Sequence, residues 1–312
     1  MHSEAFDRRA IPSDARFGEW KAADGWTVRT LDRRQKPGAE VRGSLLFAGG
    51  RGDFIEKYLE AQDHWHRRGW NVTAFDWRGQ GASQGDLPGG HLDSFDTLVG
   101  DLAGLIEQWR GETARPHVVV AHSMGGHVLL RALADRRAKI DAAVLVAPML
   151  MINSGPMPPV AAQWLASTAS LFGWSGQPAW QQPSRPEPAG SMRQAFLTGC
   201  PDRYDDELWW WEKHPSFNLG APSWGWLKAA YQSCAALTPA SLAGVETPVL
   251  LIGTERDRLV SPAAIRRAAS LLPRAELVMV EDAAHEILRE RDEVRLRALG
   301  SIDAFLDRSA GR

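Results

Sequence analysis

The segment His117-Val-Val-Val-Ala-His-Ser-Met-Gly-Gly126, which runs directly into His127-Val-Leu-Leu-Arg-Ala-Leu, decides the fold that we expect. A β-branched run passes through a turn of small residues into an apolar helical pattern. This order is typical of a nucleophile elbow, a tight strand-to-helix turn that holds a Ser hydroxyl above the end of a parallel sheet. Positions two before and two after the Ser must be small, because strand and helix crowd there. Ala121 and Gly125 satisfy this, so we expect Ser123 to be a nucleophile.

Strand and helix patterns alternate on both sides of this segment. Asp24-Gly25 between two alternating runs predicts an opening β-hairpin over 17–29. Strands that alternate with helices indicate an α/β fold, with a mostly parallel sheet covered by helices on both faces. The further strands are expected at 41–47, 71–75, 117–121, 142–147, 248–253 and 276–280, and the helices at 54–68, 94–110, 262–272 and 289–306.

The alternation stops between about 149 and 236, in a segment that is rich in Pro and holds eight of the fourteen Trp residues. We therefore expect an α/β core formed by 1–148 and 237–312, with an inserted helical cap at 149–236. These Trp residues either pack the cap onto the core, or they line an apolar pocket or a surface that meets lipid, since Trp suits an environment that is apolar at one end and wet at the other. Trp210 is our candidate pocket residue.

Composition excludes several classes of function. The net charge of −2 gives no electrostatic reason to expect nucleic acid or an anionic membrane as a partner. No apolar run approaches the roughly 18 residues that span a bilayer, and the polar N-terminus lacks the apolar stretch of a signal peptide, so we expect a cytoplasmic protein. Cys200 and Cys234 have no metal-ligand spacing; free thiols are expected, although a disulfide between them stays open.

A Ser nucleophile needs a base that an acid holds in place. In this chain order the acid follows a late strand and the His follows the last strand. Asp257 follows the strand at 248–253 and His285 follows the strand at 276–280, so both loops leave the same sheet edge as Ser123. Within these loops Glu255 is a rival for the acid, and Asp282 is a more distant third.

An oxyanion hole requires backbone N–H groups from the residue after the nucleophile and from the loop after an early strand. Met124 and Arg51 are the expected donors, because Gly50 and Gly52 let the loop around Arg51 approach a substrate oxygen closely. Gly50 is therefore also a candidate substrate contact. A plain Gly turn is the alternative, and the spacing does not match a phosphate-binding fingerprint.

Two other residues are candidate substrate contacts. The segment Asp76-Trp-Arg-Gly-Gln-Gly-Ala-Ser83 is better explained as an acid and an Arg that tie down a Gly-rich turn beside the site, but its Trp77 is a candidate pocket residue. His122 flanks Ser123 in the elbow, where a scaffold role is favoured and a pocket role stays open.

These motifs together resemble α/β-hydrolase fold enzymes of the lysophospholipase and monoacylglycerol lipase type, a group that also holds serine aminopeptidase-like hydrolases. The resemblance rests on 121–126, on 76–83, on the Gly-Arg-Gly loop, on 257–260 and on 284–286, and it spans about 40–306. It implies ester hydrolysis through an acyl-enzyme, with no metal and no organic cofactor. Where the family often has His-Gly-x-Gly-Glu, this chain has Gly49-Gly-Arg-Gly-Asp53.

Three functions follow as hypotheses. The leading one is a carboxylic ester hydrolase that acts on a monoacyl lipid, with transient lipid contact through the cap. The second is a peptidase or amidase of the same fold, for which the acidic cluster at 202–207 would hold a substrate amine. The third, a non-catalytic binding member, is disfavoured because Ser123, His285 and a loop acid are all present.

Overall fold

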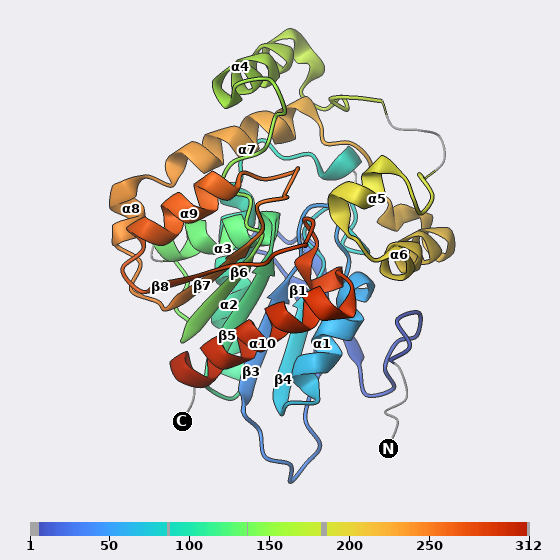
Figure 1. Ribbon diagram of the computed structural model, residues 1–312, viewed down its shortest axis with the longest axis vertical. Coiled ribbons are helices and arrows are strands. Elements are labelled where there is room, and N and C mark those ends of the chain that lie inside the picture. The colour runs from blue at the N-terminus through green and yellow to red at the C-terminus, as the bar shows by residue number, and fades with distance from the viewer. Residues whose placement is uncertain (1–5, 86–87, 136, 182–185, 311–312) are drawn as a thin grey trace.

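A computed structural model describes residues 6–85, 88–135, 137–181 and 186–310. Its centre is an eight-stranded sheet in the order β1-β2-β4-β3-β5-β6-β7-β8, in which β1 and β2 form the predicted hairpin and pair antiparallel, β2 also pairs antiparallel with β4, and all other neighbours are parallel (Figure 1). The α/β fold is therefore confirmed. The strands are β1 (Arg16–Lys21), β2 (Thr27–Arg33), β3 (Gly43–Ala48), β4 (Trp70–Phe75), β5 (His117–His122), β6 (Ala142–Val146), β7 (Val249–Gly253) and β8 (Ala275–Met279).

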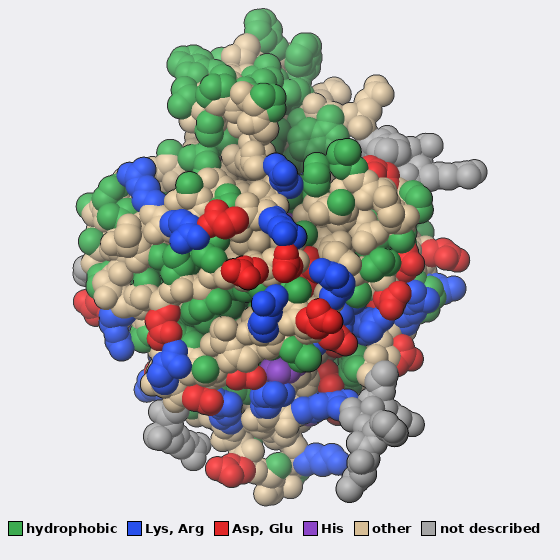
Figure 2. All heavy atoms as spheres, viewed as in Figure 1, with side chains coloured by type: hydrophobic (Ala, Val, Ile, Leu, Met, Phe, Trp, Pro, Cys, Tyr) green, Lys and Arg blue, Asp and Glu red, His purple; other side chains and the backbone are tan. Residues whose placement is uncertain are grey.

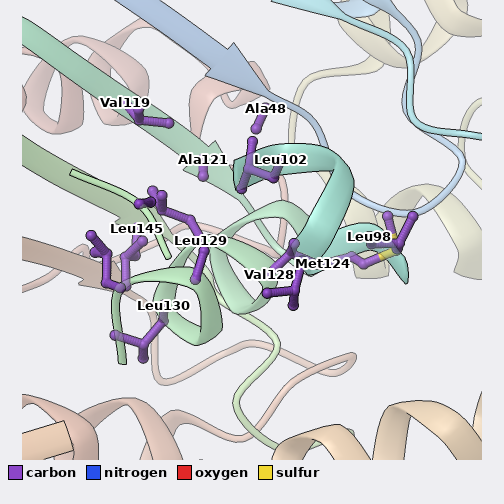
Figure 3. Packing of buried hydrophobic residues seen from close by; sticks show 14 of the residues in the cluster. Ala48, Leu98, Leu102, Val119, Ala121, Met124, Val128, Leu129, Leu130 and Leu145 are labelled. Carbon is purple, nitrogen blue, oxygen red and sulfur yellow. The ribbon is translucent and has the colours of Figure 1, made fainter. Parts of the chain in front are cut away.

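The central strands are buried on both faces, and their side chains alternate between two apolar clusters. In β5, Val119 and Ala121 pack with helices α2 and α3, whereas Val118 and Val120 pack with α1 and α10 on the opposite face. Figure 3 shows side chains of the first cluster packed between the sheet and α3. The core helices are α1 (Leu59–His66), α2 (Asp96–Glu112), α3 (Met124–Ala134), α8 (Pro239–Ala243), α9 (Pro262–Leu271) and α10 (Asp292–Ser309).

Two predicted helices have different limits in the structure. The pattern at 54–68 is a short 3₁₀ turn, η1 (Ile55–Tyr58), followed by α1, and the last helix begins at Asp292 after the turn η5 (Ile287–Arg289). Glu290 separates η5 from α10 with extended backbone angles (φ −70°, ψ 171°). Its carboxylate accepts hydrogen bonds from the N–H groups of Gly199 and Ala284 at 2.9 and 2.7 Å. A helical sequence pattern does not predict such tertiary contacts.

The segment between β6 and β7 forms the predicted helical insertion. In Figure 1, α4 stands at the top of the molecule above α7, and α5 and α6 lie to one side. That this insertion is a separate subdomain with limits at 149 and 236 stays a prediction. Its elements are α4 (Pro159–Ala169), η3 (Ser170–Trp174), α5 (Met192–Leu197), α6 (Pro201–Lys213), η4 (Pro215–Phe217) and α7 (Trp224–Ala236).

The Asp-x-Arg-Gly-Gln-Gly segment is a turn that its Asp76 and Arg78 hold in place, and Arg78 pairs with Asp24 and Asp101. The buried carboxylate of Asp76 accepts the N–H groups of Ile55 and Ala82, each at 2.8 Å, and pairs with Arg29. A Cβ atom at Gly81 (φ +54°) would lie 2.3–2.6 Å from this carboxylate, so only Gly fits there. The structural interpretation of this motif is thus confirmed.

The other sequence features concern membranes and thiols. None of the helices in the described ranges is long and apolar enough to cross a bilayer. Cys200 and Cys234 are buried free thiols, so the disulfide alternative was wrong.

The elbow is a tightly packed turn of the backbone. Ser123 has φ +49° and ψ −114°, a strained conformation between β5 and α3. A Cβ atom at Gly125 would lie 2.4 Å from the carbonyl oxygen of Gly49 and 2.7 Å from that of Ala48. Because these are backbone atoms, they cannot move aside as a side chain could.

We predict that Gly125→Ala lowers the free energy of unfolding by about 1–3 kcal/mol, because the added methyl group forces strand and helix apart. Gly300→Ala is the matched control, since a Cβ atom added at this position of α10 would meet nothing within 4 Å; it should raise stability by about 0.4–1 kcal/mol. Urea denaturation measures both. Equal stability of the two variants would contradict the crowding argument.

Candidate active site

Three side chains from separate loops form one chain of hydrogen bonds at the carboxyl edge of the sheet. Ser123 Oγ lies 2.9 Å from His285 Nε2, and His285 Nδ1 lies 2.8 Å from Asp257 Oδ2. The other carboxylate oxygen, Asp257 Oδ1, accepts the backbone N–H groups of Leu259 and Val260 at 2.8 and 3.0 Å. Both oxygens of the acid are therefore held, which orients His285 toward the serine.

The electrostatics of this chain favour proton transfer from Ser123 to His285. Burial opposes the charged form of His285, but the carboxylate of Asp257 outweighs it and raises the pKa of the imidazole above its ordinary value. Burial raises the pKa of Asp257, but His285 and the two backbone N–H groups lower it by a larger amount. The pKa of Asp257 therefore lies below its ordinary value. The acid thus remains ionised beside the base.

The rival acids lie elsewhere. Glu255 is exposed and forms an ion pair with Arg266 of α9. Asp282 is half exposed and pairs with Arg256 at 2.8 Å. In the described part of the chain, Asp257 is the carboxylate that contacts the imidazole nitrogens of His285.

The loop after β3 is clamped on each side of Arg51. The N–H of Gly50 donates to Asp53 Oδ2 at 2.5 Å, and the N–H of Gly52 donates to Gln80 Oε1 at 2.6 Å. A Cβ atom at Gly50 would lie 3.0 Å from Ser123 Cβ, so this backbone passes very close to the serine. The N–H of Arg51 donates to no acceptor in the described residues.

The N–H of Met124 is also left without a helical partner. Met124 is the first residue of α3, and the first N–H groups of a helix have no intrahelical acceptor. Its N–H and that of Arg51 therefore come from the two elements that an oxyanion hole uses. The roles of Asp53 and Gln80 as clamps were missed from the sequence, although Gln80 belongs to the Asp-x-Arg-Gly-Gln-Gly motif.

His122 is buried against the opposite side of the elbow. Its Nδ1 lies 3.0 Å from the hydroxyl of Tyr58 and 2.9 Å from Asp53 Oδ2, and its Nε2 lies 3.4 Å from the carbonyl oxygen of His285. These contacts make it part of the scaffold under the serine, and His122 also contributes to the floor of the pocket.

A buried ion cluster behind the site was not anticipated from the sequence. Lys57 Nζ lies 2.8 Å from Asp53 Oδ1 and 2.6 Å from Glu286 Oε1, and it approaches Glu207 of the insertion at 3.5 Å. Arg289 also pairs with Glu207 and Glu286. Burial opposes every charge here, yet the opposite charges prevail: the pKa of Lys57 is raised, and that of Glu286 is lowered to about 2.

A pocket of about 720 Å³ opens above Ser123, between the core and the insertion. Gly50, Arg51, His122, Met124 and His285 form its floor. Its apolar walls come mainly from the insertion and from the loop after β7: Ile152, Trp180, Met192, Phe196, Trp211, Leu219, Trp226, Leu227 and Leu259.

Two expected pocket residues lie outside this lining. Trp77 is buried, with its indole N–H donating to the carbonyl of Gly49 at 2.7 Å. Trp210 is buried on the far side of α6, where its indole N–H reaches the carbonyl of Arg8, and its neighbour Trp211 lines the pocket instead. In a run of consecutive Trp residues, each is rotated by about 100° around the helix, so helical phase decides which one faces the pocket.

No group of three or more His, Cys, Asp or Glu side chains in the described ranges is arranged to hold a metal ion.

Comparisons with known proteins agree with this architecture. The chain is 29% identical over 284 residues to the probable lysophospholipase L2 of Haemophilus influenzae, covering 87% of this chain and 86% of that protein. It is also 29% identical over 288 residues to lysophospholipase L2 of Escherichia coli, covering 85% and 80%.

Solved structures share the fold. A soluble variant of monoglyceride lipase from Saccharomyces cerevisiae superposes with a TM-score of 0.75 at 16% identity, covering 99% of this chain and 100% of that one. A thermostable carboxyl esterase from Bacillus coagulans gives 0.74 at 16% identity, covering 96% and 99%.

The profile of one protein family spans most of the chain. It is described as serine aminopeptidase, S33, and it matches residues 39–292, which include the elbow, the loop after β3 and both late loops. The sheet topology, the elbow and this match together show that the chain belongs to this family of α/β hydrolases.

Proposed function

We propose that this protein hydrolyses the carboxylic ester of a monoacyl lipid through an acyl-enzyme. The observation that carries the proposal is the hydrogen-bonded chain Ser123–His285–Asp257, with separations of 2.9 and 2.8 Å, on the floor of an apolar pocket. A pocket of about 720 Å³ lies within the usual range of roughly 300–1,000 Å³ for small-molecule sites.

The mechanism follows from the geometry. Ser123 Oγ attacks the ester carbonyl carbon while His285 Nε2 takes its proton, and Asp257 stabilises the imidazolium that forms. The N–H groups of Met124 and Arg51 receive the oxyanion, and such donors typically contribute about 2.7–4 kcal/mol each to the transition state. His285 then gives the proton to the leaving alcohol, and a water activated by the same imidazole hydrolyses the acyl-enzyme.

The acidic cluster does not favour an aminopeptidase. Asp206 accepts from Arg8 and Arg9 of the N-terminal segment, and Glu207 pairs with Arg193 and Arg289. Of the described residues in this cluster, Glu207 is the one that lines the pocket. Because Glu207 is already paired with two Arg side chains, it offers no free negative charge for a substrate amine. The apolar pocket walls suit an acyl chain better, which supports the ester over the amide.

The tip of the insertion supports a lipid substrate. Six large apolar side chains of α4 and η3 are 47–85% exposed, and Figure 2 shows this apolar surface at the top of the molecule, over the position of α4 in Figure 1. An exposed apolar patch of this kind marks an interaction surface. We propose that this tip patch makes transient contact with lipid; it consists of Val160, Trp164, Leu165, Leu171, Phe172 and Trp174. A cytoplasmic location stays a prediction.

Ser123→Ala should lower kcat for a short-chain monoacylglycerol by at least about 10⁴-fold, since the nucleophile is lost. The wild-type protein should be labelled at Ser123 by a fluorophosphonate and the variant should not. A wild-type protein that neither turns over any acyl ester nor takes the label would refute the proposed function.

The proposal that Asp257 and not Glu255 is the acid can be tested with one variant of each residue. Asp257→Asn should lower kcat by about 10⁴-fold, because the amide no longer holds the required imidazole tautomer. Glu255→Gln, in the same loop, should stay within about twofold of wild type, since Glu255 contacts Arg266 at the surface. Steady-state ester hydrolysis measures both variants, and an active Asp257→Asn would overturn the assignment.

For the tip patch, the double variant Leu171→Gln/Phe172→Gln should bind phosphatidylcholine vesicles at least about tenfold more weakly than wild type, because each fully buried large apolar side chain contributes about 1.5–3 kcal/mol. Leu296→Gln is the control, since Leu296 is equally apolar and 54% exposed, but lies on α10 of the core. Vesicle co-sedimentation is the measurement. Equal binding by all three proteins would reject the patch as a lipid contact.

A further inference from the structure

One cation beside the nucleophile has no counter-ion. Among the described residues, three Lys or Arg side chains line the pocket. Lys57 pairs with Asp53 and Glu286, and Arg193 pairs with Glu207 at 2.8 Å. In the described residues, no carboxylate oxygen lies within ion-pair distance of Arg51.

The guanidinium of Arg51 is instead held by neutral groups. Its Nη2 donates to the carbonyl oxygens of Gly89 and Gly220, at 2.9 and 3.0 Å, and its Cζ lies 5.2 Å from the ring centroid of Trp226. These contacts fix the plane of the guanidinium without cancelling its charge. Nε is buried without an acceptor, and Nη1 donates to no group in the described chain.

An unpaired charge in this position is costly for folding. Buried charges in proteins are usually paired, because removal from water penalises the ionised form. That penalty lowers the pKa of Arg51 to about 9. The Arg51 side chain is thus held in place although burial disfavours its charge, and among the described residues its Nε and Nη1 have no acceptor. This arrangement is expected of a group that binds an anion.

Within the part of the chain that the structure describes, the other charged groups of the pocket leave Arg51 as its unpaired cation. Asp53, Glu207 and Glu286 are neutralised within the ion cluster, and Asp257 is engaged by His285. Glu187 also reaches the lining, but no ion pair joins it to Arg51. An anionic group would therefore find its partner in the residue whose own backbone N–H faces the reacting carbonyl.

We propose that the Arg51 side chain is an anion subsite and that the ester cleaved at Ser123 belongs to a monoacyl glycerol that carries a phosphate, as in a lysophospholipid. This inference rests on the proposed ester hydrolysis and adds the class of head group. A guanidinium suits phosphate oxygens, and charge-assisted hydrogen bonds to it are stronger than neutral ones. Because the ester and the phosphate share one glycerol unit, a single residue can serve both, with its backbone N–H at the carbonyl and its side chain at the phosphate.

The test compares two substrates with the same short acyl chain, 1-acylglycerol and 1-acylglycerol 3-phosphate, below their micelle concentrations. The wild-type protein should have the higher kcat/KM for the phosphorylated ester. Arg51→Gln should lower the ratio of the two kcat/KM values by about 10- to 100-fold, because a hydrogen bond to a charged group is lost. Arg51→Lys should keep an intermediate ratio, since it retains the charge without the planar fork.

Arg193→Gln is the matched control, because it removes a pocket cation that already has a carboxylate partner; its ratio should stay within about twofold of wild type. Fluorophosphonate labelling of Ser123 reports an intact elbow in each variant. Should Arg51→Gln be too unstable to label, inhibition of wild type by glycerol 3-phosphate, compared with glycerol, tests the subsite directly.

The outcomes separate this inference from the proposed function. If both esters are hydrolysed but the ratio is unchanged in Arg51→Gln, or both rates fall equally, Arg51 merely ties the loop to the insertion and the subsite is rejected. Equal inhibition by glycerol and glycerol 3-phosphate also rejects it. If wild type hydrolyses neither ester and Ser123 takes no label, the ester hydrolysis itself is refuted, and the subsite with it.

Discussion

The active-site geometry depends on one close approach, that of Gly125 at the start of α3 to the backbone carbonyls of Ala48 and Gly49 at the end of β3. This contact lets β5 turn sharply enough to place Ser123 at φ +49° and to hold its hydroxyl out from the sheet edge. It also brings the loop after β3 beside the serine. The proposed nucleophile and the proposed oxyanion donors therefore share one steric requirement, the absence of a side chain at Gly125.

The second constraint is the buried ion cluster around Lys57. Asp53 belongs to this cluster and also accepts the N–H of Gly50, so the loop that carries Arg51 is tied to the same charges. Glu286 joins it directly after His285, and Glu207 joins it from the insertion. Breaking such a pair would leave an uncompensated buried charge. The cluster thus couples the position of the proposed base, the oxyanion loop and the insertion.

The core and the insertion contribute different kinds of residue to the pocket. The core supplies the polar floor, where charge would develop in the proposed ester cleavage, and the insertion supplies most of the apolar wall. Arg51 lies at the junction, since its backbone belongs to the core loop and its guanidinium reaches the carbonyl of Gly220 in the insertion.

The sequence alone determined the α/β architecture, the elbow at Ser123 and the order of that serine, a loop acid and His285. These depend on short-range patterns: strand and helix periodicity, small residues around the serine, and loops that follow strands. Only the tertiary structure decided which loop carboxylate meets His285, since Glu255 and Asp257 are two residues apart and equally acidic. It also decided that Trp211 and not Trp210 faces the pocket. Among the described residues, it left Arg51 without a counter-ion while Lys57 has several. Such outcomes depend on which side chains from distant segments share one buried space, and no local pattern encodes that.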